Sequence, residues 1–136
     1  MMAGLHRPER VRCVVALGAP SDLEDVEAGG ESLEDVFDSD HLHAASPLNM
    51  SVESPPQTLL VHGSLDRVVN IEQSRRHRDA RPDTVELIEV QDGDHGLRWP
   101  PLGAWRARRQ AIDWMVDQLE LPSRGSKWKR RRKGKR

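Results

Sequence analysis

Several features that mark whole classes of protein are scarce or missing in this sequence. Cys13 is the one cysteine, which excludes a disulfide framework and a zinc site built from thiolates. No apolar run approaches the ~18 residues that a membrane-spanning helix needs, so we expect no contact with a membrane. The opening "MMAGLHRPER" lacks the apolar segment of a secretory signal, which favours a cytoplasmic protein.

Lysine is missing from most of the chain and concentrated at its end. The formal net charge is only −1, but residues 124–136 hold nine of the 21 Lys and Arg residues and no acid. The remaining 123 residues carry 12 basic and 22 acidic side chains, a formal charge of −10. We therefore divide the chain into an acidic body, residues 1–121, and a basic tail, residues 122–136, which is most simply explained as solvated and disordered.

Three short apolar runs, each followed by glycine or a glycine-rich turn, predict β-strands at residues 11–17, 58–62 and 85–90. Their centres lack long polar alternation, as in strands that are covered on both faces. Helical patterns follow the second and third runs, at residues 71–80 and 103–119, and Asn70 and Gln73 have capping-box spacing at the first of them. Strands that alternate with helices indicate an α/β fold with a parallel sheet and crossover helices.

A long acidic connection, residues 19–57, separates the first two predicted strands. Its sequence predicts one or two short helices, around residues 22–27 and 31–38. Connections of this length in compact domains are often functional covers, so we interpret it as a lid-like segment.

Two residues with complementary chemistry follow the ends of neighbouring strands. Asp66 comes just after the second strand and His95 just after the third, and the carboxyl ends of parallel strands share one edge of a sheet. A carboxylate there can hold one imidazole nitrogen so that the other serves as a general base. Asp92 and Asp94 are also near His95 in sequence, and Asp66 taken alone suits a turn. His62 is better explained as a packing residue than as a base.

The sequence around these residues resembles the C-terminal part of an α/β-hydrolase. "LLVHGSLDRVV" is similar to the seventh strand and acid loop of that family, and "VELIEVQDGDHGL" to its eighth strand and histidine loop. "RPERVRCVVALGAPSDL" looks like the sixth strand and "ASPLNM" like the segment that enters the seventh, so the resemblance covers about residues 1–121. Within that family, the sequence is most similar to the esterase, dienelactone-hydrolase and prolyl-oligopeptidase-like group. The resemblance implies that His95 acts first as a general base and then as a general acid, and that Asp66 orients it. It also implies that the substrate is a small-molecule ester or, less favoured, a peptide, and that no cofactor takes part.

The sequence departs from that family in one large respect. The nucleophilic serine should precede Asp66 in a G-x-S-x-G motif, and the 136 residues contain no such motif. Loss of a triad member typically costs ~10⁴ to 10⁶ in rate, so we expect this chain alone to be inactive. We interpret it as a fragment of a longer hydrolase in which Met1 is internal and the nucleophile lies on the order of ten residues upstream.

Expectations about partners follow from this interpretation. Without a further neighbour, the strand at residues 11–17 would expose an apolar edge, which favours self-association. The alternative function is a non-catalytic protein whose basic tail binds nucleic acid or an acidic partner, although a charge run alone has low specificity. His41 and His43 suggest a metal only weakly, because no third ligand accompanies them, and we expect no metal.

Overall fold

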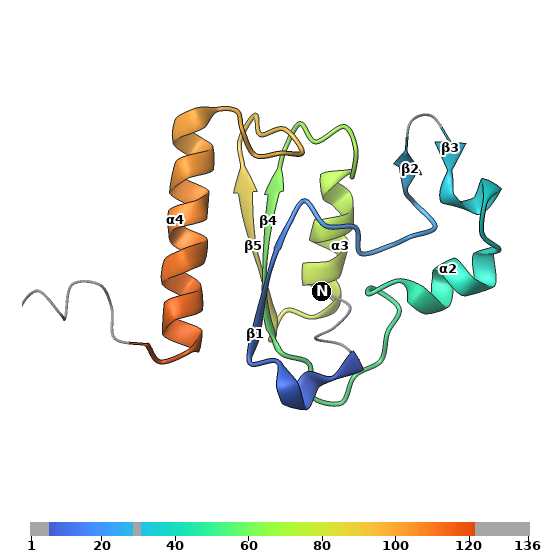
Figure 1. Ribbon diagram of the computed structural model, residues 1–136, viewed down its shortest axis with the longest axis horizontal. Coiled ribbons are helices and arrows are strands. Elements are labelled where there is room, and N and C mark those ends of the chain that lie inside the picture. Colours follow the sequence, from blue (N-terminus) through green and yellow to red (C-terminus); the bar gives the residue numbers. More distant parts are fainter. Residues whose placement is uncertain (1–5, 29–30, 122–136) are drawn as a thin grey trace, which may run out of the picture.

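The computed structural model describes residues 6–28 and 31–121. Its centre is a three-stranded parallel sheet in the order β1 (Cys13–Leu17), β4 (Gln57–Gly63), β5 (Val85–Val90), as Figure 1 shows. The predicted α/β fold with three parallel strands is therefore confirmed, and the three strands differ from their predicted bounds by no more than two residues. The predictions for the basic tail, residues 122–136, lie outside the described residues.

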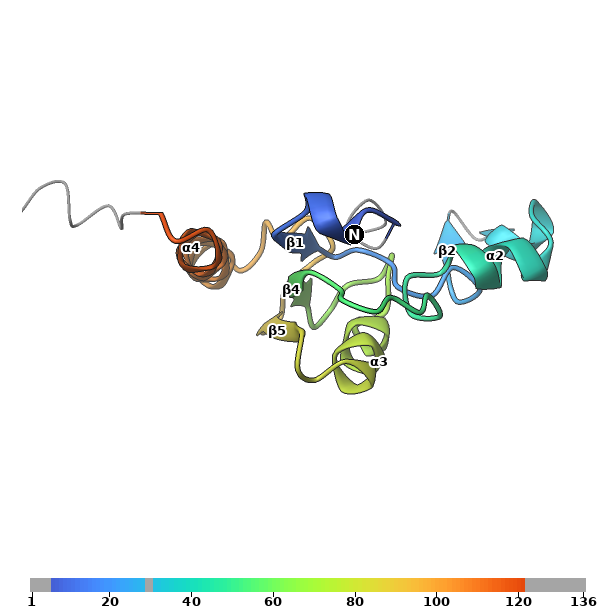
Figure 2. The ribbon, with the colours of Figure 1, turned by 90° about the horizontal axis from the view of Figure 1, so that it is seen from below.

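Helices cover both faces of the sheet (Figure 2). Helix α4 (Pro101–Gln118) packs on one face against all three strands, and α3 (Ile71–Ala80) packs on the other against β4 and β5. Alternating residues of β4 supply the two halves of the core: Leu59 and Val61 pack toward α4, and Leu60 packs with residues of the opposite face. Because β4 is paired on both sides and covered on both faces, it is almost entirely buried, as its continuous apolar run predicts.

The inner stripe of α4 is built from alanines. Ala104, Ala107 and Ala111 are buried against the sheet, at the helical spacing read from the sequence. Their small side chains let the helix lie close to the strands, but the stripe is not covered along its whole length, since Met115 is exposed. No helix in the described ranges has both the length and the apolar character needed to cross a bilayer.

Helix α3 begins where the sequence predicts, but the side chain of Gln73 does not take part in its cap. The Asn70 side chain accepts from the amide of Glu72 at 3.0 Å and caps the helix. The predicted capping box is wrong, because the side-chain oxygen of Gln73 instead accepts from the amides of Ser21 and Asp22, at 3.0 and 3.1 Å. The buried face of α3 is polar because it binds the long connection as well as the sheet.

The long connection lies on the α3 side of the molecule and extends away from the sheet (Figures 1 and 2). Its elements, in order, are β2 (Glu27–Ala28), β3 (Glu31–Ser32), a single 3-10 turn (Leu33–Asp35) and α2 (Ser39–Ala45). The predicted helix around residues 22–27 is wrong, because the amides there bond to Gln73 and β2 follows. The predicted helix around residues 31–38 is reduced to the 3-10 turn, and α2 begins after it.

Candidate active site

The loops that follow β4 and β5 are packed directly against each other at the carboxyl edge of the sheet. The amide of Ser64 donates to the carbonyl of Val90 at 3.0 Å, and the amide of Leu65 donates to that of Gly93 at 2.9 Å. Position 63 must be glycine for this contact, because a Cβ there would lie 2.3 Å from the Gly93 carbonyl oxygen. The close approach of the two backbones brings the side chains of the two loops together.

Asp66 and His95 meet where these loops touch. Nδ1 of His95 lies 2.9 Å from Oδ2 of Asp66, and since an ionised carboxylate only accepts, the imidazole donates. The Asp66 side chain is fully buried, whereas the His95 side chain is 42% exposed. With Nδ1 held by the carboxylate, Nε2 of His95 is the nitrogen left to exchange a proton with another molecule. We call these two residues the Asp66–His95 pair.

The buried carboxylate of Asp66 is fully hydrogen-bonded. Its Oδ1 accepts from the amides of Val68 and Val69, at 2.8 and 2.9 Å. Its Oδ2 accepts from His95 and also lies 3.1 Å from Nε2 of His62. Desolvation alone would raise the pKa of Asp66, but the two amides and His95 outweigh it and hold the pKa below its ordinary value. Asp66 is therefore an anion at neutral pH.

The two other acids considered for His95 have different partners. Oδ1 of Asp94 accepts from the amide of Arg98 at 2.7 Å, and this bond is the main cause that lowers the pKa of Asp94. The amide of Asp92 donates to Oγ of Ser64 at 2.8 Å and helps to join the two loops. Neither carboxylate is hydrogen-bonded to His95.

Gly18 is part of the site, although the sequence indicated only that it ends the first strand. It has a φ of +53°, and a Cβ there would lie 3.2 Å from Nδ1 of His95 and 3.3 Å from Oδ2 of Asp66. A side chain would press on the hydrogen bond of the pair and would also strain the backbone. The available signal was positional, because Gly18 follows a strand whose carboxyl end is at the same edge.

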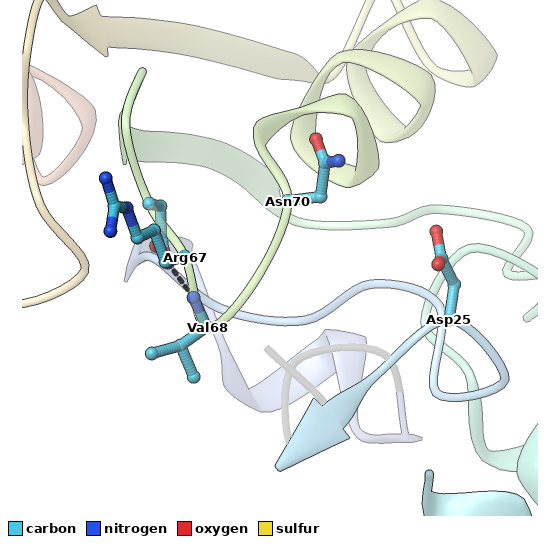
Figure 3. Close-up of a pocket in the computed structure, with 5 residues that line it drawn as sticks. Asp25, Arg67, Val68 and Asn70 are labelled. Carbon is cyan, nitrogen blue, oxygen red and sulfur yellow. Dashed lines mark hydrogen bonds between the residues drawn. The ribbon is translucent and has the colours of Figure 1, made fainter. Parts of the chain in front are cut away.

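Two hollows adjoin the Asp66–His95 pair. One has a volume of about 310 Å³ and is lined by Asp25, Asp66, Arg67, Val68 and Asn70. Figure 3 shows Asp25 across this hollow from Arg67 and Val68. The other has a volume of about 390 Å³ and is lined by Leu65, Arg67, Val68, Asp94, His95, Gly96 and Arg98. Because the side chain of His95 is exposed and that of Asp66 is buried, a small organic group in the second hollow can lie next to the imidazole.

Among the described residues, neither a nucleophile nor a metal cluster accompanies the Asp66–His95 pair. Within residues 6–28 and 31–121, no serine, threonine or cysteine is hydrogen-bonded to His95. The described residues also contain no cluster of three His, Cys, Asp or Glu side chains arranged for a metal. His43, one of the two histidines considered for a metal, instead lies 2.9 Å from the carboxylate of Glu24. The site thus presents an oriented imidazole beside two hollows.

Comparison with known proteins gives matches in structure only. No sequence family matches the chain, and neither does any curated protein. A puromycin-hydrolyzing peptidase of Mycobacterium tuberculosis superposes with a TM-score of 0.74 at 18% identity, over 90% of this chain and 20% of that one. An esterase of Thermogutta terrifontis gives 0.67 at 18% identity, over 85% and 45%. A truncated carbohydrate esterase from gut microbiota gives 0.62 at 22% identity, over 79% and 42%.

The chain has part of the α/β-hydrolase fold. It spans less than half the length of each of these three structures, and it matches the C-terminal part of the fold. Identities of 18 to 22% establish the fold alone. Within the described sheet, Asp66 follows β4 and His95 follows its neighbour β5.

Proposed function

We propose that the Asp66–His95 pair is the acid and base of a serine hydrolase that acts on carboxylic esters. One observation carries the proposal: a fully buried carboxylate holds Nδ1 of a half-exposed imidazole at 2.9 Å. The esterases and peptidases among the structural neighbours support the same reaction class. Small-molecule esters are the proposed substrates, and the hollows of about 310 and 390 Å³ beside the pair have room for a small organic group.

The proposed chemistry assigns one role to each residue. Nε2 of His95 takes the proton of a serine hydroxyl as that oxygen attacks the ester carbonyl, and Asp66 stabilises the resulting imidazolium. His95 then gives this proton to the leaving alcohol. A water molecule, activated by the same nitrogen, hydrolyses the acyl-serine and restores the starting state. The low pKa of Asp66 suits this role, because the residue must remain an anion while His95 changes charge.

The nucleophile and the oxyanion hole are proposed to come from sequence outside these 136 residues. No G-x-S-x-G occurs in the chain, and Ser64, the serine closest to Asp66 in sequence, already accepts the amide of Asp92 through its hydroxyl. The oxyanion donors of an α/β-hydrolase are the amide after the nucleophile and one in an earlier loop. We therefore expect the chain alone to be close to inert.

The test extends the reading frame upstream of Met1 and assays p-nitrophenyl butyrate hydrolysis. We expect a G-x-S-x-G within about 20 codons, and an extended chain that hydrolyses the ester. His95→Ala should lower kcat by about 10⁴-fold or more, and Asp66→Asn by about 10⁴-fold, because each disrupts the proton transfer. His41→Ala is the matched control, since His41 is exposed and bonded to Asp38 in α2's cap.

Two results would overturn the proposal. One is an upstream frame without a G-x-S-x-G. The other is an extended chain whose His95→Ala variant hydrolyses the ester as fast as its His41→Ala variant does.

A further inference from the structure

We propose that His62 is a positioning residue, whose Nε2–H fixes Oδ2 of Asp66 and so directs that oxygen at His95. The inference deepens the proposed function and rests on the role of Asp66 as the orienting acid. A second imidazole, that of His62, lies 3.1 Å from the same carboxylate oxygen. The sequence alone suggested His62 only as a packing residue.

His62 lies near the end of the central strand β4 and is completely buried. Its Nε2 is 2.9 Å from the carbonyl oxygen of Val69 and 3.1 Å from Oδ2 of Asp66. Its Nδ1 is 2.7 Å from Oγ of Ser74, on α3. Every polar atom of the imidazole therefore has a partner, and the ring is held from three sides.

The partners determine where the imidazole carries its proton. A backbone carbonyl can only accept, so Nε2 must be protonated to bond with Val69. Oδ2 of Asp66 is ionised and also only accepts, and it lies 3.1 Å from the Nε2 whose hydrogen bond goes to Val69. In the proposed arrangement this N–H is shared between the two oxygens. A hydroxyl can donate or accept, so Ser74 satisfies Nδ1 in either charge state of His62.

The shared N–H matters because of how Asp66 is held elsewhere. The amides of Val68 and Val69 fix Oδ1, and Nε2 of His62 is a buried nitrogen 3.1 Å from Oδ2. The remaining donor to Oδ2 is His95, whose side chain is half-exposed and so cannot position the carboxylate by itself. With His62 in place, the carboxylate plane is set from the interior and the exposed imidazole aligns to it.

A purely structural role for His62 predicts something different. Burial of a polar ring in a central strand is costly unless the ring is fully bonded, and an apolar residue would fill the same space without that requirement. If His62 served only to join β4 to α3, its bond to Ser74 would be the important one. The two roles therefore depend on opposite nitrogens of one ring, and variants can separate them.

The experiment uses the whole 136-residue chain, labelled with ¹⁵N-histidine, at a pH where His95 is neutral. Long-range ¹H–¹⁵N spectra report which ring nitrogen of His95 carries the proton. In the unmutated chain we expect the Nδ1–H form, because that nitrogen donates to Asp66. Asp66→Asn is the positive control and should convert His95 to the Nε2–H form.

Three variants then test His62. His62→Phe keeps a ring but removes the donor, and it should lose the predominance of the Nδ1–H form at His95. His62→Gln places an amide N–H near the position of Nε2 and should restore that form. Ser74→Ala removes the bond to Nδ1 of His62 and should leave the His95 tautomer unchanged.

A folded His62→Phe chain that keeps the Nδ1–H form of His95 would overturn the proposal, as would loss of that form in Ser74→Ala alone. If His62→Phe does not fold, the test uses the Nε2–H resonance of His62 itself, compared between the unmutated chain and Asp66→Asn. It should shift in Asp66→Asn if the N–H is shared with Asp66, and stay in place if Val69 is its only partner. Failure of the proposed esterase activity would leave these spectra unchanged, so the two hypotheses are separable.

Discussion

His77 is a buried base whose environment opposes its protonation. It lies on the inner face of α3, its side chain is only 2% exposed, and its Nδ1 has no hydrogen-bond partner among the described residues. Desolvation, followed by the nearby charge of Arg81, lowers the pKa of His77 to about 4. An apolar residue would normally cover the sheet at this position, and the structure places an uncharged histidine there.

The depressed pKa of His77 predicts a specific loss of stability in acid. Between about pH 6.5 and pH 4 the unfolded chain binds a proton at His77 that the native chain excludes, so stability falls as the pH falls. The full shift corresponds to roughly 3 kcal/mol. Urea unfolding at pH 7.5 and pH 4.5 gives the drop in the free energy of unfolding on acidification. This drop should be smaller in His77→Leu than in the unmutated chain by about that amount. His41→Gln, at an exposed site, is the control, and an equal acid loss in His77→Leu would contradict the prediction.

At the scale of elements, α3 holds the long connection through polar side chains at both ends. Gln73 is fully buried, and besides the amides of Ser21 and Asp22 it bonds to the carbonyl of Asp25. At the far end, Nη2 of Arg81 donates to three carbonyls of the connection, those of Pro47, Leu48 and Met50. The connection is thus attached to a helix that also packs on β4 and β5, next to the candidate site.

Gln73→Leu tests this attachment. The change removes the acceptor for two amides, and each buried group left unsatisfied costs about 1–3 kcal/mol. Hydrogen exchange should therefore speed up at Ser21 and Asp22, and global stability should fall. Gln110→Leu is the matched control, because Gln110 is an exposed position on α4. Unchanged exchange at residues 21–25 in the Gln73 variant would show that other contacts hold the connection.

At the scale of the whole molecule, β1 lies at the edge of the described sheet. Within residues 6–28 and 31–121 no strand pairs with its outer side. Beside it runs an apolar groove of about 250 Å³, lined by Val15, Leu17, Arg108, Ala111, Ile112 and Met115. An unpaired strand edge next to exposed apolar side chains promotes pairing with another chain.

We therefore expect the chain to self-associate through this edge. Sedimentation velocity over a series of concentrations should show species larger than a monomer, and Leu17→Lys should shift the population toward monomer because it places a charge in the groove. Val36→Lys is the control, since Val36 is, like Leu17, an exposed aliphatic residue but lies in the long connection. A chain that is monomeric at every concentration tested would contradict the expectation.

Much of the fold was predictable because its signals are local. Continuous apolar runs indicated strands covered on both faces, and helical patterns indicated α3 and α4. The connection was predicted less well, because part of its backbone, at residues 21–25, bonds to Gln73, 48 to 52 residues away. No local pattern distinguishes a glutamine that caps a helix from one that binds a distant loop.

The sequence by itself determined the parallel sheet and placed Asp66 and His95 at the same edge of it, because the carboxyl ends of parallel strands share one edge. Only the tertiary structure decided which acid holds His95, that Nε2 of His62 lies 3.1 Å from the same carboxylate oxygen, and that Gly18 leaves room for the pair. The physical reason is that hydrogen bonds and close contacts at the site depend on ångström-scale distances between separate elements. Those distances are set by how the elements pack, and the pattern within any one element does not contain them.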